Sequence, residues 1–113
     1  MKCNGAYTIR HKRSQVSLAE TAFVDRLEAA GLIVERQARV GRFVVDALCK
    51  SSNAVIEFNG EFWHSLPHIK AKDKRKAAAI TAAGYRLVTV GEREWMDDPD
   101  ETVRKVIRDV EDV

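Results

Sequence analysis

The chain has 113 residues and a formal net charge of +2, with 45% hydrophobic and 32% charged residues. This length suits one compact domain of ordinary globular composition. No apolar run approaches the ~20 residues of a membrane span, and the first residues lack a signal peptide. Cys3 and Cys49 form neither a zinc motif nor a disulfide framework. The sequence therefore predicts an intracellular, cytoplasmic protein with no membrane partner.

The predicted elements alternate between helices and strands. Residues 1–16 form a basic N-terminal arm, and residues 17–113 form a single domain. The expected elements are a helix from the capping-box pattern Ser17-Leu18-Ala19-Glu20 to Gly31, strands over 32–40, 43–49 and 54–58, a helix over 69–83, a strand over 85–90 and a helix over 99–110. A tight turn makes the second and third strands antiparallel, and a helical crossover precedes the last strand. The order α-β-β-β-α-β-α predicts an α/β (α+β) fold with a mixed four-stranded sheet flanked by helices.

Basic residues gather in two stretches. One is Arg10-His11-Lys12-Arg13 and the other runs from Lys70 to Lys76, whereas acidic residues are frequent after Asp97. This asymmetry permits a basic face that contacts phosphates, and a solvated helix surface is the alternative interpretation. Helical spacing places residues 72, 76 and 80 on one stripe and 70, 74 and 77 on another, so these lysines cannot all face one DNA strand.

Two acidic residues, Asp46 and Glu57, lie in the apolar strands of the predicted hairpin. If the turn centres on Ser51-Ser52, Asp46 lies directly opposite Glu57, where Cβ atoms are roughly 4.5–5.5 Å apart and like charges are destabilising. A hard divalent metal bound through carboxylate oxygens would compensate this repulsion. The alternatives are that one side chain points to solvent, that it pairs with Lys50 or Arg42, or that the register is shifted by one residue.

The segment after the third strand reads Asn59-Gly60-Glu61-Phe62-Trp63-His64. Histidine is the side chain best suited to acid–base chemistry near neutral pH, and this one follows the strand where a loop can fold over the carboxylates. The aromatic pair Phe62-Trp63 suits stacking on bases or wedging between them. The alternatives are a structural or exposed histidine and a core position for at least one of the two rings.

These motifs together resemble the very-short-patch-repair branch of the PD-(D/E)XK nuclease superfamily, and within it the EDxHD homing endonucleases. The resemblance is carried by Asp46, the string from Ile56 to His64, Asp73 and the run from Gly84 to Val90, and it covers roughly residues 17–95. It implies a restriction-endonuclease-like core and hydrolysis of double-stranded DNA with Mg²⁺, for which Mn²⁺ can substitute. It also implies a bacterial or phage-infected host.

The resemblance and the basic stretches together give three sets of expected site residues. The catalytic residues are Glu20, Asp46, Glu57, His64 and Asp73. The metal ligands are Asp46, Glu57 and the backbone carbonyl of Phe58. The DNA contacts are Arg10, Lys12, Arg13, Asn59, Phe62, Trp63, Lys70, Lys72, Lys74, Arg75 and Lys76. In this hypothesis the metal polarises the scissile phosphate, His64 handles a proton, and Asp73 orients His64. Glu20 has an alternative role in the capping box with Ser17.

Asn59 departs from the superfamily pattern. It stands where the usual (D/E)xK lysine would fall and where the repair enzymes have a histidine, so His64 is expected to take over the proton-handling work. The alternatives are a mismatch-nicking repair endonuclease or junction resolvase on the same core, and a non-catalytic DNA-binding module, which Asn59 favours and the retained acidic residues disfavour. A double-strand cut would require a homodimer with one site per chain.

Overall fold

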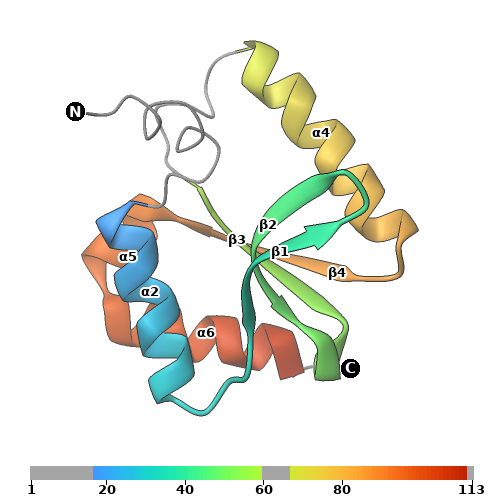
Figure 1. The fold of residues 1–113 in the computed structure, drawn as a ribbon. Coiled ribbons are helices and arrows are strands. Elements are labelled where there is room, and N and C mark those ends of the chain that lie inside the picture. The colour runs from blue at the N-terminus through green and yellow to red at the C-terminus, as the bar shows by residue number, and fades with distance from the viewer. Residues whose placement is uncertain (1–16, 60–66, 112–113) are drawn as a thin grey trace, which may run out of the picture.

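The computed structural model describes residues 17–59 and 67–111, with the side chains of residues 67–70 outside the description. The elements, in chain order, are α2 (Leu18–Ala29), β1 (Glu35–Val40), β2 (Phe43–Cys49), the 3₁₀ helix η1 (Lys50–Ser52), β3 (Ala54–Asn59), α4 (Pro67–Ala82), β4 (Arg86–Gly91), α5 (Glu92–Asp97) and α6 (Pro99–Glu111) (Figure 1). No helix within the described residues is long and apolar enough to cross a membrane.

The strands form one mixed sheet in the order β1-β2-β3-β4. β1 pairs antiparallel with β2, β2 pairs antiparallel with β3, and β3 pairs parallel with β4. The parallel pair follows from the helical crossover through α4, which returns the chain to the same end of the sheet. The predicted fold class, a mixed four-stranded sheet flanked by helices, is confirmed.

Helix α2 begins and ends as its sequence predicts. The Glu20 backbone N–H donates a hydrogen bond to Ser17 Oγ at 3.0 Å, which satisfies one of the N–H groups left free at a helix start. Gly31 follows the helix with a φ of 104°, a conformation that glycine adopts without steric cost. The buried residues Phe23, Val24 and Leu27 then face the sheet. This packing fixes where the side chain of Glu20, one turn earlier, meets the strands.

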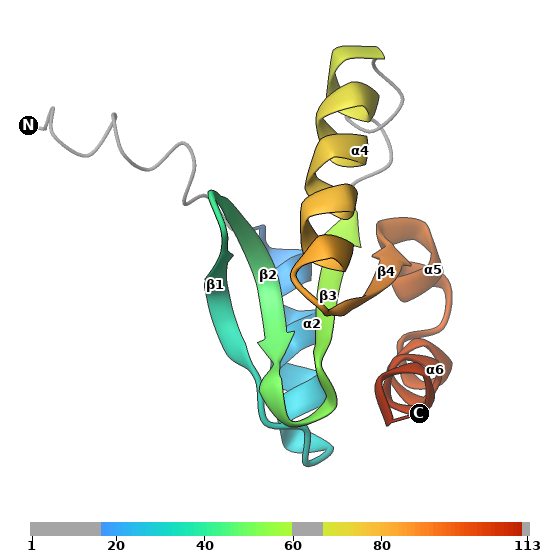
Figure 2. The ribbon, with the colours of Figure 1, turned by 90° about the vertical axis from the view of Figure 1, so that its right-hand side faces the viewer.

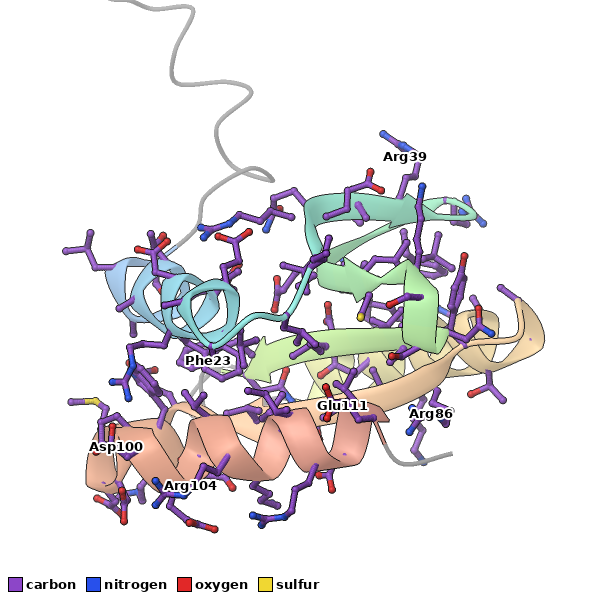
Figure 3. All side chains as sticks on the ribbon, turned by 90° about the horizontal axis from the view of Figure 1, so that it is seen from below. Phe23, Arg39, Arg86, Asp100, Arg104 and Glu111 are labelled. Atoms are coloured by element: carbon purple, nitrogen blue, oxygen red, sulfur yellow. The ribbon has the colours of Figure 1, made fainter. Side chains whose placement is uncertain are left out.

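Helices cover both faces of the sheet, with α2, α5 and α6 on one side and α4 on the other (Figure 2). On the first side Phe23 packs against Phe58, with ring centroids 5.3 Å apart, and edge-on against Trp95 at 5.5 Å. Figure 3 shows Phe23 inside the layer between α2 and α6. The smaller cluster on the second side consists of Ala38, Val40, Val45, Leu48, Val55 and Ile80.

The structure differs from the predicted elements in three places. The first strand begins at Glu35, because the chain from Gly31 to Val34 leaves the helix without pairing. The turn between β2 and β3 is the 3₁₀ helix η1. The short helix α5 was not predicted, although Glu94 stands three residues after Gly91, as the glutamate of a capping box does. In the structure the Gly91 backbone N–H donates to Glu94 Oε1 at 3.3 Å, which is half of a capping box.

Candidate active site

Asp46 and Glu57 face each other across β2 and β3. The observed pair Ala47↔Ile56 sets the register, and the next step along it is Asp46 opposite Glu57, which confirms the predicted register. Here each carboxylate accepts a hydrogen bond from a backbone N–H of the facing strand. The Asp46 N–H donates to Glu57 Oε2 at 2.8 Å, and the Phe58 N–H donates to Asp46 Oδ2 at 2.7 Å. The two carboxylates are therefore held at fixed positions by the backbone of the facing strand.

The two carboxylates open into different hollows. Asp46 lines a hollow of about 170 Å³ on the α2 side, together with Glu20, Thr21, Val24, Arg36 and Gln37. Glu57 lines a hollow of about 130 Å³ on the α4 side, together with Asn59, Asp73, Lys76, Ala77, Ile80, Leu87 and Thr89. The structure thus brings together four of the five predicted catalytic residues, Glu20 and Asp46 in one hollow and Glu57 and Asp73 in the other.

Glu20 reaches the site from the first turn of α2. Its backbone N–H supplies the helix cap described above, while its carboxylate Oε2 accepts a hydrogen bond from Gln37 Nε2 at 3.2 Å. The structure thus shows the Ser17 half of the predicted capping box, while the Glu20 carboxylate bonds Gln37 and lines the hollow.

Negative charge accumulates around Glu20 and Asp46. Burial, followed by the charge of Asp46, raises the pKa of Glu20 to about 8. Burial, followed by the charge of Glu57, raises the pKa of Asp46 to about 6, against the opposing effect of the Phe58 N–H. Ionisation of Glu20 and of Asp46 is therefore disfavoured, first by limited access to water and then by the negative charges nearby.

Lys76 supplies positive charge on the other side of the sheet. Its Nζ donates to Glu57 Oε1 at 2.7 Å, and the two side chains are only 20% and 14% exposed. Lys76 was predicted to contact the DNA backbone, and its ion pair with Glu57 was not predicted from the sequence. Its neighbours Lys72, Lys74 and Arg75 are exposed. Lys50, an alternative partner for the acidic pair, instead lies 3.4 Å from Glu35.

Some predicted residues fall outside the described part of the chain. His64, the fifth predicted catalytic residue, is among them, as are Phe62 and Trp63 and the arm residues Arg10, Lys12 and Arg13. Lys70 belongs to α4, but its side chain is outside the description. Their predicted roles therefore stay predictions.

The described residues suit a hard divalent cation. Mg²⁺ prefers oxygen ligands and is commonly held by one or two carboxylates, with water completing its shell. Asp46 and Glu57 provide two carboxylates, and each oxygen already in a hydrogen bond keeps a second lone pair. Residues 17–59 and 67–111 contain no group of three or more His, Cys, Asp or Glu side chains that could hold a metal ion. The donors present are carboxylate oxygens, which are the ligand type that a hard divalent cation prefers.

Comparisons with known proteins agree with this fold. The family model REase_MTES_1575, which describes a restriction-endonuclease-like family, matches residues 20–110. The chain belongs to this family, and its class is therefore that of restriction-endonuclease-like nucleases. The matched region begins at Glu20 and includes both hollows.

A solved structure titled "Homing Endonuclease I-Bth0305I Catalytic Domain" is similar to this chain, with a TM-score of 0.67 and 22% sequence identity. The match covers 82% of this chain and 93% of that one. At this level of identity the similarity establishes the shared fold. A search of curated proteins finds no significant match.

Proposed function

We propose that this protein is a metal-dependent DNA endonuclease that hydrolyses phosphodiester bonds with Mg²⁺, or with Mn²⁺ in its place. The observation that carries the proposal is that Glu20 and Asp46 share one hollow, with Glu57 bonded to the Asp46 backbone on the facing strand, in a chain of a restriction-endonuclease-like family. Burial, followed by the charge of neighbouring carboxylates, raises the pKa of Glu20 and of Asp46, and perturbed pKa values of this kind cluster at functional sites.

The residues divide the chemistry between the two hollows. Asp46 and Glu57, with the carbonyl of Phe58, are the proposed ligands. A metal bound there would polarise the scissile phosphate and stabilise the charge on the leaving oxygen. Glu20 lies beside Asp46, where it can accept a hydrogen bond from the attacking water. We propose that His64 handles the proton and that Asp73 orients it, as their positions in the sequence suggest.

Lys76 can supply the positive charge that the superfamily's lysine would supply at position 59. Asn59 cannot carry a positive charge, but Lys76 brings an ammonium group to Glu57 from α4, and both residues line the same hollow as Asn59. We propose that Lys76 takes the electrostatic role of the superfamily lysine. Its neighbours Lys72, Lys74 and Arg75 are exposed and would contact the DNA backbone instead.

This division of roles predicts different results for two lysines one helical turn apart. Lys76→Met is expected to lower kcat for cleavage by about 10- to 100-fold, as the loss of a supporting partner at a metal site does. Lys72→Gln is expected to leave kcat unchanged and to reduce the slope of log affinity against log salt by about 0.9, the loss of one phosphate contact. Steady-state cleavage and salt-dependent DNA binding measure the two effects. A loss of salt slope in Lys76→Met with kcat intact would show that Lys76 contacts phosphate.

The proposed function is tested by cleavage of supercoiled plasmid and linear duplex DNA. Nicked or linear products are expected with Mg²⁺ or Mn²⁺, none in EDTA, and recovery on adding excess Mg²⁺. Ca²⁺ is a useful control, because it matches the charge of Mg²⁺ with a different geometry and supports DNA binding with little cleavage. DNA binding without cleavage under any divalent metal would establish the non-catalytic DNA-binding module instead.

Within this class, we propose the homing-endonuclease branch with EDxHD-type residues, on the motifs of residues 46–64 and the structural similarity described above. Cleavage of a long intact target supports this branch, whereas a single nick beside a mismatch, or preference for a four-way junction, would favour a repair enzyme or a resolvase. We further propose residues 17–113 as one nuclease domain with residues 1–16 as a basic DNA-contacting arm, acting as a homodimer for double-strand cuts.

A further inference from the structure

Gln37 has an unusual backbone conformation in the middle of a strand. Its φ is 50°, in the left-handed region that residues other than glycine adopt rarely and at some energetic cost. The pairs Arg36↔Ala47 and Ala38↔Val45 flank it, so Gln37 lies opposite Asp46 in the β1–β2 register. A strained residue therefore sits directly across from a proposed metal ligand.

β1 changes faces at Gln37. Arg36, just before it, reaches α2 and bonds Asp25 and Glu28 at 2.6 Å each. Ala38, just after it, lies in the cluster on the α4 side, although regular alternation would put it on the same face as Arg36. The left-handed conformation of Gln37 is the local cause of this reversal.

β2 changes faces at the matching position. Val45 packs on the α4 side, whereas Ala47 packs on the α2 side, although two residues apart they would normally share a face. Leu48 packs on the α4 side. Because Asp46 precedes Leu48 by two residues, regular alternation would place the Asp46 side chain on the α4 side as well. The reversal instead lets Asp46 open toward Glu20 on the α2 side.

The Gln37 side chain also contacts the site directly. Its Nε2 donates to Glu20 Oε2 at 3.2 Å, and Gln37, Glu20 and Asp46 line the same hollow of about 170 Å³. An amide donor suits this place because it holds a carboxylate without adding charge, whereas another acid would add to the repulsion.

We propose that Gln37 is a positioning residue of the nuclease site: its backbone turns Asp46 toward α2, and its amide holds the Glu20 carboxylate beside Asp46. This inference rests on the proposed function for its catalytic meaning. The link between Gln37 and Glu20 is a property of the metal-free chain and can be tested separately.

Gln37→Gly separates the two parts of this role, since glycine keeps the left-handed backbone but lacks the amide. We expect the thermal midpoint to stay within a few degrees of the parent, kcat for DNA cleavage with Mg²⁺ to fall about 10- to 100-fold, and KM for DNA to stay unchanged. Asn53→Gly is the matched control. Asn53 also has a positive φ, 52°, but it lies at the η1 turn away from both hollows, so its variant should cleave like the parent.

A double-mutant cycle with Glu20→Gln identifies the pathway. If Gln37 acts through Glu20, Gln37→Gly should lower kcat little further in the Glu20→Gln background, and the two substitutions should also be non-additive in urea unfolding of the metal-free chain. The inference would be overturned if Gln37→Gly cleaved DNA with the kcat of the parent, or if the losses of kcat in the two single variants simply multiplied in the double variant. The nuclease proposal would be unaffected by either result. If the parent chain cuts no DNA, the nuclease proposal fails. In that case, additive changes in the free energy of unfolding, measured with urea, would overturn the Gln37–Glu20 link as well.

Discussion

Asp46→Asn is expected to lower metal-dependent DNA cleavage by about 10³-fold or more, the largest effect on activity in this protein. The carboxylate is a proposed metal ligand, and losing a metal's charge stabilisation removes several kcal/mol from the stabilisation of the transition state. The asparagine oxygen can still accept the Phe58 N–H bond that Asp46 Oδ2 accepts at 2.7 Å, so the strand geometry should survive. Single-turnover cleavage of a defined duplex measures the loss.

The same variant has a second expected effect that excludes misfolding as the explanation. Removing the charge of Asp46 relieves its repulsion with Glu20 and Glu57, so the metal-free variant should unfold at or above the parental temperature at pH 8. Asp109→Asn, an exposed substitution on α6, is the control with the same chemical change away from the site. Parental cleavage by Asp46→Asn, once shown to be folded, would remove Asp46 from the mechanism.

Without metal, the protein is expected to lose stability as the pH rises from about 4.5 to about 8. Burial, followed by the charge of neighbouring carboxylates, raises the pKa of Glu20 to about 8 and of Asp46 to about 6, above their values in an unfolded chain. The folded state therefore binds more protons than the unfolded state in this range, and stability that is complete at low pH disappears as the carboxyls ionise. After allowance for solvent screening, the loss is about 1–2 kcal/mol, or several degrees in Tm.

Divalent metal should reverse this trend. Mg²⁺ binds the ionised carboxylates, so its stabilising effect is larger at pH 8 than at pH 5, and it amounts to about 2.7 kcal/mol at a hundredfold excess over Kd. Thermal unfolding from pH 5 to 8, with and without Mg²⁺, measures both effects. The double variant Glu20→Gln, Asp46→Asn should show neither. A metal-free Tm that rises over this range would contradict the assignment of the raised pKa values.

The hairpin register was predictable because its causes are local. The turn at Ser51-Ser52 and the β-forming residues around it fix which positions oppose each other, and the structure places Asp46 opposite Glu57 as expected. The longer helices were predictable for the same reason: caps and glycines mark their ends, and α6 deviates from its predicted bounds by one residue, whereas the short α5 was missed. The sequence therefore revealed the two carboxylates and the elements that carry them.

The partners of these carboxylates were not predictable, since they depend on tertiary placement. Lys76 belongs to a basic helix, and only the docking of α4 on the sheet shows that it turns inward to Glu57 while Lys72 stays exposed. Gln37 carries no motif at all. Glutamine in a strand has no reason to adopt a positive φ until the faces of β1 and β2 must reverse around Asp46. Contacts between distant elements left no pattern in the sequence that could identify them.

The bend at Gln37 also bears on how the protein avoids self-association. β1 is an edge strand of the sheet. A straight edge strand presents unpaired backbone N–H and C=O groups that can pair with a strand of another molecule. Here the left-handed residue interrupts that row at its middle. The charged side chains of Glu35, Arg36 and Arg39 are exposed along the strand, and Arg39 projects outward from it (Figure 3). One residue thus shapes the hollow on its inner side and blocks strand addition on its outer side, so a β-branched residue at position 37 would both distort the site and leave the sheet prone to aggregation.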